Sequence, residues 1–309
     1  MDLQSVSVCL MQGRTLEKSS RMSGITDGSY DFIEAVPARL PVLLSSPHSG
    51  TAFPDEYREG LAVKEEVLRP LGDGPVDRMF EPVCDDAGVS MIRARYSRAV
   101  VDLNRKADEI APELLATPGH HRLRVTDKVR VGLGVIPTRI NSIVLHARSM
   151  SDEELRGRID GLHEPYHEAI DATMSDLSER FGHALLVDCH SMPSGIAVVQ
   201  GRAVDVVIGD AHGRSAEPAL VDLAFETFGS AGFLVRLNQP YAGGYITRRH
   251  GRPRFGRSAI QFEFQRNLFM DESSRQLHEG SRRIALAMQE FVGRAGAWIT
   301  GHRRAVVAA

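Results

Sequence analysis

The stretch from Ala184 to His190 constrains the fold of this chain more than any other. Four apolar residues, Ala184-Leu-Leu-Val187, run directly into Asp188-Cys189-His190, and the turn-forming sequence Ser-Met-Pro-Ser-Gly follows. A short apolar run bounded by turn signals predicts a buried strand of an α/β sheet. Open α/β sheets bind ligands at the carboxyl ends of such strands, which makes Asp188 and His190 candidates for a site. The alternative is that Asp188 only closes the turn and His190 packs in the core.

The same arrangement occurs nearer the N-terminus, where a strand predicted over residues 41–46 leads into Pro47-His48-Ser-Gly50. Hydrophobic periodicity predicts further strands over residues 89–95, 99–103, 204–208, 233–237 and 259–265. It predicts helices over residues 74–87, 151–181, 217–228 and 273–298, and a glycine-led loop over residues 243–250. Strands that alternate with helices indicate an α/β fold.

The organisation along the chain is simple. Residues 1–30 are polar and aperiodic, which predicts an N-terminal extension ahead of a single domain over residues 31–300. A short C-terminal tail, residues 301–309, is expected after the last helix. The chain has no internal repeat and no low-complexity linker that would argue for a second domain.

The composition argues against several classes of protein. A net charge of -3 gives no reason to expect nucleic acid or an anionic membrane as partner. Cys9, Cys84 and Cys189 are far apart and odd in number, which argues against a disulfide framework and a cysteine-rich zinc module. No apolar run reaches the roughly 18 residues of a membrane span, and the first residues lack a signal-peptide pattern. We therefore expect a cytoplasmic enzyme or binding protein.

The most conspicuous motif match is His163-Glu-Pro-Tyr-His167, which satisfies the H-E-x-x-H pattern of zinc proteases. Pro165 lies inside the match, where it removes a helical hydrogen bond and crowds the preceding turn. The surrounding helix also has a complete apolar face without these residues. We interpret the two histidines as solvated or packing residues on a kinked helix, not as zinc ligands.

A better candidate site is scattered through the chain. His48 and His190 each follow a predicted strand, and Asp73 precedes a predicted helix. Two imidazoles and a carboxylate make an ordinary three-ligand catalytic zinc site with a fourth position for water. Glu263, on the polar side of an otherwise apolar strand, is the candidate general base. Two alternatives stay open: Asp73 caps the helix, and Glu263 pairs with an arginine on a solvated face.

Several arginines lie at predicted strand ends or in loops: Arg95, Arg98, Arg105, Arg248 and Arg249. Asn104-Arg105 and Arg248 are best placed to bind a carboxylate, because a guanidinium grips it with two parallel hydrogen bonds. A serine nucleophile, Ser46 or Ser191, is disfavoured because no G-x-S-x-G motif is present. The phosphate-loop and dinucleotide-binding glycine motifs are also absent, which argues against nucleotide chemistry.

Taken together, five motifs resemble the N-formylglutamate amidohydrolase family over roughly residues 35–295. They are Pro47-His-Ser-Gly50, Arg95-Tyr-Ser-Arg-Ala-Val-Val-Asp-Leu-Asn-Arg105, Asp188-Cys-His-Ser191, Gly243-Gly-Tyr-Ile-Thr-Arg248 and Gln261-Phe-Glu-Phe264. The resemblance implies a metal-dependent amidohydrolase that converts N-formyl-L-glutamate and water to formate and L-glutamate, closing one route of histidine degradation. It also implies a three-layer α/β/α sandwich with a mixed, mostly parallel sheet, similar to the zinc carboxypeptidases.

The resemblance assigns roles residue by residue. His48, Asp73 and His190 match the metal-binding positions for Zn2+ or another divalent ion, and Glu263 matches the strand glutamate. The proposed substrate-binding residues are Asn104, Arg105, Arg98, Arg248 and Tyr245, and Arg105 is also a catalytic candidate that would steady the oxyanion. Tyr245 stands where some members have histidine, and Asp73-Gly-Pro differs from the family's Asp-Trp-His. Both departures bear on specificity for the acyl group or the amino acid.

Two rival functions remain at this point. The first keeps the metal and changes the substrate, giving another N-acyl amino acid deacylase or a carboxypeptidase-like hydrolase. The second is a binding protein that keeps the fold without turnover. In the enzyme hypotheses the partner is a small N-acyl amino acid, with no nucleic acid and no membrane.

Overall fold

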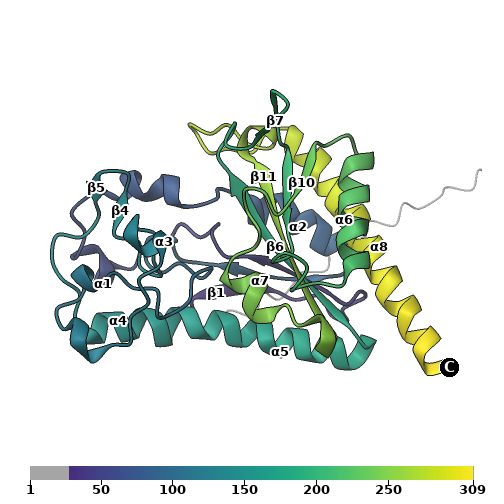
Figure 1. The fold of residues 1–309 in the computed structure, drawn as a ribbon, viewed down its shortest axis with the longest axis horizontal. Helices are drawn as coiled ribbons and strands as arrows, with labels where there is room; N and C mark the ends of the chain where they lie inside the picture. The colour runs from purple at the N-terminus through teal and green to yellow at the C-terminus, as the bar shows by residue number, and fades with distance from the viewer. Residues whose placement is uncertain (1–27, 309) are drawn as a thin grey trace, which may run out of the picture.

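The computed structural model describes residues 28–308, so the predicted extension lies outside the described residues except for residues 28–30. Its centre is a seven-stranded sheet of order β1-β3-β2-β6-β11-β9-β10 (Figure 1). The strands are β1 (Tyr30–Ile33), β2 (Val42–Ser46), β3 (Ser90–Ala94), β6 (Ala184–Met192), β9 (Val206–Gly209), β10 (Val235–Leu237) and β11 (Arg257–Gln265). Pairing is antiparallel between β1 and β3 and between β11 and β9, and parallel elsewhere. The sheet is therefore mixed and mostly parallel.

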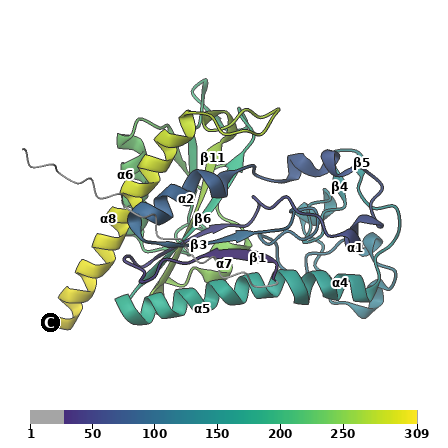
Figure 2. The ribbon, with the colours of Figure 1, turned by 180° about the vertical axis from the view of Figure 1, so that it is seen from behind.

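Helices cover both faces of this sheet (Figures 1 and 2). Helices α2 (Val76–Ala87), α6 (Pro218–Ser230) and α8 (Gly280–Ala308) pack on one face, and α5 (Glu164–Phe181) and α7 (Tyr245–His250) pack on the other. The prediction of a three-layer α/β/α architecture is confirmed. Each layer interface has its own apolar cluster, because residues of alternate parity along every strand point to opposite faces.

The two central strands carry polar residues toward their carboxyl ends. On one face Cys189 of β6 and Phe262 of β11 join the core under α2, α6 and α8. On the opposite face the strands change from apolar to polar along the chain: Leu186, Asp188 and His190 on β6, and Ala259, Gln261 and Glu263 on β11. The parallel register places Glu263 directly beside His190. The sheet itself thus brings two of the predicted site residues together.

A group of short elements lies beside the sheet, at the left of Figure 1. It includes α1 (Asp55–Arg58), α3 (Asp127–Arg130), β4 (Arg139–Ile140) and β5 (Ile143–Val144), with 3₁₀ turns at Glu65–Leu71, Pro112–Leu114 and Pro118–His120. Backbone hydrogen bonds join the earlier and later segments of this group. Ala62 N–H donates to the Leu145 carbonyl, and Ala147 N–H donates to the Gly60 carbonyl. Elsewhere β7 (Val198–Val199) pairs with β8 (Arg202–Ala203), and 3₁₀ turns lie at Pro253–Phe255 and Arg266–Leu268.

The structure confirms the long helix that begins after the capping box at Ser151. The helix is interrupted just before Pro165, the residue that predicts a kink. Helix α4 (Asp152–Arg158) leads into a π-helical turn, Ile159–His163, before α5 begins at Glu164. Pro165 lies in the first turn of α5, where a missing backbone N–H costs least. Gly182 ends α5 in the left-handed conformation, as expected for a C-cap glycine.

Two local predictions are wrong for a tertiary reason. Residues 99–103 form turns instead of a strand, because Asp102 Oδ1 accepts the Asn104 N–H at 2.9 Å and Asp102 N–H donates to the Val135 carbonyl outside the sheet. The predicted loop over residues 243–250 contains helix α7, whose Ile246 N–H donates to Asn104 Oδ1 at 2.9 Å. A side chain from a distant loop therefore serves as the helix cap.

The last helix starts and ends later than predicted. Asp271 Oδ1 accepts the N–H groups of Ser273 and Ser274, so these residues form a turn before α8 begins at Gly280. Helix α8 continues through Ala308, and residues 301–308 are helical where a tail was expected. That residues 31–300 form a single domain stays a prediction. In the described part of the chain, no helix has the length and apolar character needed to span a bilayer.

Candidate metal centre

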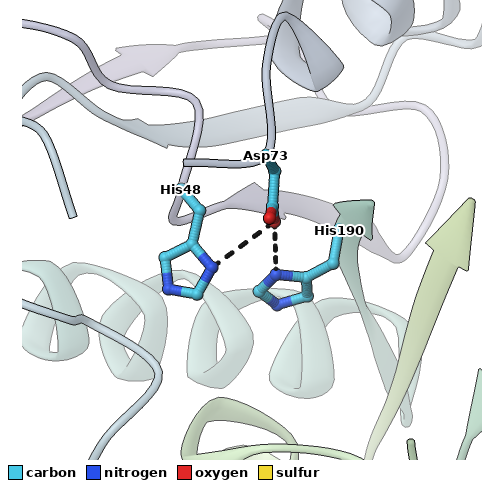
Figure 3. A group of neighbouring side chains, drawn as sticks. All are labelled: His48, Asp73 and His190. Carbon is cyan, nitrogen blue, oxygen red and sulfur yellow. Dashed lines mark hydrogen bonds and ion pairs between the residues drawn. The ribbon is translucent and has the colours of Figure 1, made fainter. Parts of the chain in front are cut away.

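His48, Asp73 and His190 come together although they are far apart in the sequence (Figure 3). His190 Nδ1 lies 2.8 Å and His48 Nδ1 lies 3.4 Å from the same atom, Asp73 Oδ2. All three side chains are buried, and their prospective ligand atoms lie within 4.8 Å of one another. The predicted ligand set is therefore one cluster.

The outer nitrogen of each imidazole is held by a second carboxylate. His48 Nε2 is 2.8 Å from Asp102 Oδ1, and His190 Nε2 is 3.1 Å from Asp188 Oδ2. In the neutral form that binds a metal, a proton on each Nε2 would donate to these carboxylates and leave the Nδ1 lone pairs on the side of Asp73. Carboxylate–histidine pairs of this kind orient the ligands of protein-bound metals. Asp188 is thus placed to orient His190.

The charges of the cluster are suited to a divalent cation. Asp73, Asp102, Asp188 and Glu263 place four carboxyl groups around the two imidazoles, and all are buried. His48 Nδ1 is buried and makes no hydrogen bond to any residue between 28 and 308. Burial alone would lower the pKa of the His190 imidazole, but Asp188 and Asp73 outweigh it and raise that pKa well above its usual value. The residues present therefore fit a metal ion with nitrogen and oxygen ligands.

Asp73 does not cap helix α2. The helix begins at Val76 after Pro75, and the first-turn N–H of Asp77 donates to Ser49 Oγ at 3.2 Å. Burial alone would raise the pKa of the Asp73 carboxyl, but His48 and His190 hold it well below its usual range. The carboxylate is thus ionised and directed at the histidines, which favours the ligand interpretation over the capping one.

Glu263 lies in the same buried region and is 8% exposed. Its Oε1 accepts a hydrogen bond from Gln261 Nε2 at 2.9 Å. Burial raises the pKa of the Glu263 carboxyl to about 7, against the opposing effect of His190. Within the described residues it forms no ion pair with an arginine on a solvated face, which was the alternative. A carboxyl group that titrates near neutrality is suited to general base catalysis.

Three of the predicted substrate-binding residues support the cluster. Asn104 Nδ2 lies 3.1 Å from His190 Nε2, and Arg98 donates Nε and Nη2 to Asp102 Oδ2 at 2.8 and 2.7 Å. Arg105 donates Nε to the Leu133 carbonyl at 3.0 Å and Nη1 to the Asn104 carbonyl at 3.4 Å. Arg98 is thus committed to the Asp102 carboxylate. Arg105 Nε also lies 3.7 Å from Asp102 Oδ2, and these contacts leave Arg105 Nη2 available.

The two predicted residues on helix α7 differ in environment. Arg248 is exposed, and its side chain makes no hydrogen bond or ion pair with the described residues. The Tyr245 hydroxyl accepts from Arg249 Nη1 at 3.1 Å, and its ring stacks on His163 with 5.9 Å between centroids. Arg248 is therefore the freer of the two to reach a ligand.

The two histidines of the H-E-x-x-H match have partners elsewhere in the chain. His163 Nε2 donates to the Arg105 carbonyl oxygen at 2.8 Å, and His167 Nδ1 is 2.9 Å from His250 Nε2. Both rings are fully buried, so the packing interpretation holds and the solvated one is wrong. The serine alternative is also unsupported, because Ser191 Oγ donates to the Asp73 carbonyl and Ser46 Oγ contacts Ser49 Oγ.

Sequence reasoning gave no role to several residues that build the centre. Asp102, Gln261 and Arg266 are buried beside it, and Ser45 Oγ donates to Asp188 Oδ1 at 3.1 Å. Each carries a signal that could have been used. Asp102 interrupts an apolar run, Gln261 shares the polar side of its strand with Glu263, and Arg266 immediately follows that strand.

The fold and this centre together define a hydrolase with a candidate metal site at the carboxyl end of a mostly parallel sheet. A model of the N-formylglutamate amidohydrolase family matches residues 40–270. The N-formylglutamate deformylases of Pseudomonas putida and Pseudomonas aeruginosa are each 31% identical to this chain, over 237 and 238 residues, and the matches cover 76% of this chain and 84% of each relative. The chain belongs to the N-formylglutamate amidohydrolase family.

Solved structures agree with this assignment. The crystal structure of N-formylglutamate amidohydrolase from Ralstonia eutropha JMP134 superposes with a TM-score of 0.82 at 30% identity, covering 90% of this chain and 99% of that one. A gene product of Agrobacterium tumefaciens, 20% identical, has the same fold with a TM-score of 0.62 over 88% of this chain and 96% of that one. The predicted family resemblance is confirmed.

Proposed function

We propose that this protein hydrolyses N-formyl-L-glutamate to formate and L-glutamate with a zinc ion held by His48, Asp73 and His190. The observation that carries the proposal is the buried His48–Asp73–His190 cluster with Glu263 in register beside it. The names of the 31% identical relatives support the choice of substrate. In the cytoplasm this reaction would close one route of histidine degradation.

The chain's own residues account for the proton transfers. A bound zinc ion supplies Lewis acidity, which polarises an amide carbonyl and lowers the pKa of water to about 7. Glu263 takes a proton from the attacking water as the new C–O bond forms, and it returns that proton to the glutamate nitrogen as the C–N bond breaks. Asp102 and Asp188 hold the two imidazoles in place throughout.

The amino-acid half of the substrate carries two carboxylates, and the proposal assigns them to Arg105 and Arg248. Arg105 is the candidate with an uncommitted Nη2, and Arg248 has an exposed guanidinium. Arg105 is also the candidate for steadying the oxyanion, whereas Arg98 acts through Asp102. Asn104 and Tyr245 complete the proposed binding residues by fixing helix α7 beside the centre.

We expect Arg248→Gln to raise KM for N-formyl-L-glutamate by about 10- to 100-fold while kcat changes little. A lost charge-assisted hydrogen bond to a carboxylate costs about 1.5–3 kcal/mol, which corresponds to that range. Steady-state kinetics measure both constants, and Arg282→Gln, an exposed arginine on α8, is the matched control. An unchanged KM would remove Arg248 from the binding site.

A substrate panel tests the proposed function as a whole. Metal-replete protein should release formate from N-formyl-L-glutamate faster than it releases acetate or succinate from the N-acetyl and N-succinyl analogues. Formate is quantified with a coupled dehydrogenase assay, and the free amine is quantified in parallel for every analogue. Preference for another acyl group would favour a different deacylase, and no turnover of any analogue would favour a binding protein.

Asp102→Asn should weaken zinc binding and lower kcat/KM by about 10- to 100-fold, because residues that orient metal ligands contribute on that scale. The substitution keeps the shape of the side chain, but the amide cannot hold the His48 Nε2 proton and Arg98 together as the carboxylate does. Chelator competition gives the affinity, and Asp127→Asn on exposed helix α3 is the control. Wild-type affinity in Asp102→Asn would contradict the orienting role.

A further inference from the structure

The segment that carries Asp73 has little stiffness of its own. Asp73 lies between Gly72 and Gly74, and Gly74 has a φ of +83°, which disfavours any residue with a Cβ. The helix that follows begins only at Val76, and its Asp77 N–H donates to Ser49 Oγ and not to Asp73. Glycines lose more conformational freedom on ordering than other residues do, so a Gly-Asp-Gly segment is costly to fix. Something outside the segment must hold the Asp73 carboxylate in place.

Hydrogen bonds from three other parts of the chain hold this backbone. The Gly72 carbonyl accepts from Arg266 Nη2 and from Arg275 Nη2, each at 2.8 Å. The Asp73 carbonyl accepts from Ser191 Oγ at 2.6 Å, and Asp73 N–H donates to the His48 carbonyl at 3.0 Å. The peptide groups on both sides of the Asp73 side chain are thereby fixed.

Arg266 connects these contacts. Its Nε donates to Ser191 Oγ at 3.1 Å while its Nη2 donates to Gly72, so one guanidinium holds two acceptors at once. The same Nη2 lies 3.8 Å from Asp73 Oδ1, and the other carboxylate oxygen, Oδ2, faces the histidines. Arg266 is 7% exposed and immediately follows β11, the strand of Glu263.

We propose that Arg266 is a positioning residue for the metal centre, which fixes Asp73 through Gly72 and Ser191 and so raises the affinity for the ion. The inference rests on the metal site of the proposed function. An arginine is required because its planar guanidinium can donate Nε to Ser191 Oγ and Nη2 to the Gly72 carbonyl at the same time. A lysine has a single ammonium group and cannot match this geometry. Fixing the ligand before the ion arrives removes the entropic cost of ordering it on binding.

The test measures metal affinity on the full-length protein. Metal-free wild type, Arg266→Gln, Arg266→Lys and Ser191→Ala are titrated with Zn2+ and Co2+ in competition with a chromogenic chelator. We expect Kd to rise by about 10- to 100-fold in Arg266→Gln, with incomplete rescue in Arg266→Lys and a smaller rise in Ser191→Ala. Arg282→Gln, an exposed arginine on α8, should bind metal as the wild type does.

Each outcome decides one question. Wild-type Kd in a folded Arg266→Gln overturns the proposal, and a raised KM alongside it would make Arg266 a substrate ligand instead. Thermal unfolding of the metal-free variants checks folding. If Arg266→Gln does not fold, the result from Ser191→Ala decides, because wild-type affinity there removes the link between the arginine and Asp73. A wild type that binds no divalent ion overturns the proposed metal centre itself, which is a separate result.

Discussion

Replacing Glu263 with glutamine is expected to lower kcat on N-formyl-L-glutamate by about 100- to 10,000-fold, the usual contribution of a positioned general acid–base group. The amide keeps the size of the side chain and its place beside His190, but it cannot take a proton from water. Zinc affinity should stay within a few-fold of wild type, because Glu263 is not one of the three proposed ligands. Steady-state kinetics and metal analysis on the same preparation measure both effects.

The pH dependence of the wild type gives an independent check on Glu263. Burial raises the pKa of this carboxyl to about 7, so the base form is lost as the pH falls through neutrality. We therefore expect kcat/KM to rise with pH on the acidic side of the optimum, and this limb to disappear in Glu263→Gln. Glu226→Gln, an exposed glutamate paired with Arg294 on the molecular surface, is the matched control. Turnover of Glu263→Gln within a few-fold of wild type would rule out the proposed base.

His190→Ala is expected to have the second largest effect. The substitution removes one ligand from the proposed zinc site, and the loss of the metal's several kcal/mol of transition-state stabilisation corresponds to a fall on the order of 1,000-fold in kcat/KM. It also leaves the buried Asp73 and Asp188 carboxylates without their shared partner. Breaking a buried ion pair in this way destabilises a protein by about 3–5 kcal/mol.

Two measurements separate these consequences. Elemental analysis of purified His190→Ala should show less than stoichiometric zinc, and thermal unfolding should show a lower Tm than that of wild type. His120→Ala is a suitable control, because His120 is an exposed imidazole that also pairs with an aspartate, Asp152. Stoichiometric zinc together with wild-type turnover in His190→Ala would disprove the ligand assignment.

The sequence predicted those parts of the centre that follow from strand patterns. The apolar run before His190 and the alternation around Glu263 are enough to place both residues on one face at the carboxyl ends of two strands. Their adjacency also needs the order of the strands, and that β6 pairs with β11 is a property of the sheet. His48 and Asp73 were selected by residue type and position, and the contacts of both with His190 are tertiary.

Local propensity failed in two segments that meet at one buried turn. Residues 99–103 have the composition of a strand, but Asp102 turns the chain and holds His48 Nε2. The glycine-led segment before Tyr245 reads as a loop, but Asn104 Oδ1 accepts the Ile246 N–H and starts helix α7. Asp102 and Asn104 belong to the same buried turn. The contacts of this one turn therefore account for both wrong predictions.

By itself, the sequence determined the α/β class of the fold and the chemical types available for a site, because hydrophobic periodicity and residue chemistry are local properties. Only the tertiary structure decided that Asp102 orients His48 and that Asp73 is held by Arg266 and Ser191 instead of capping a helix. These choices depend on hydrogen bonds between residues more than 50 positions apart. The partner of a buried polar group is set by chain packing, and no local pattern records it.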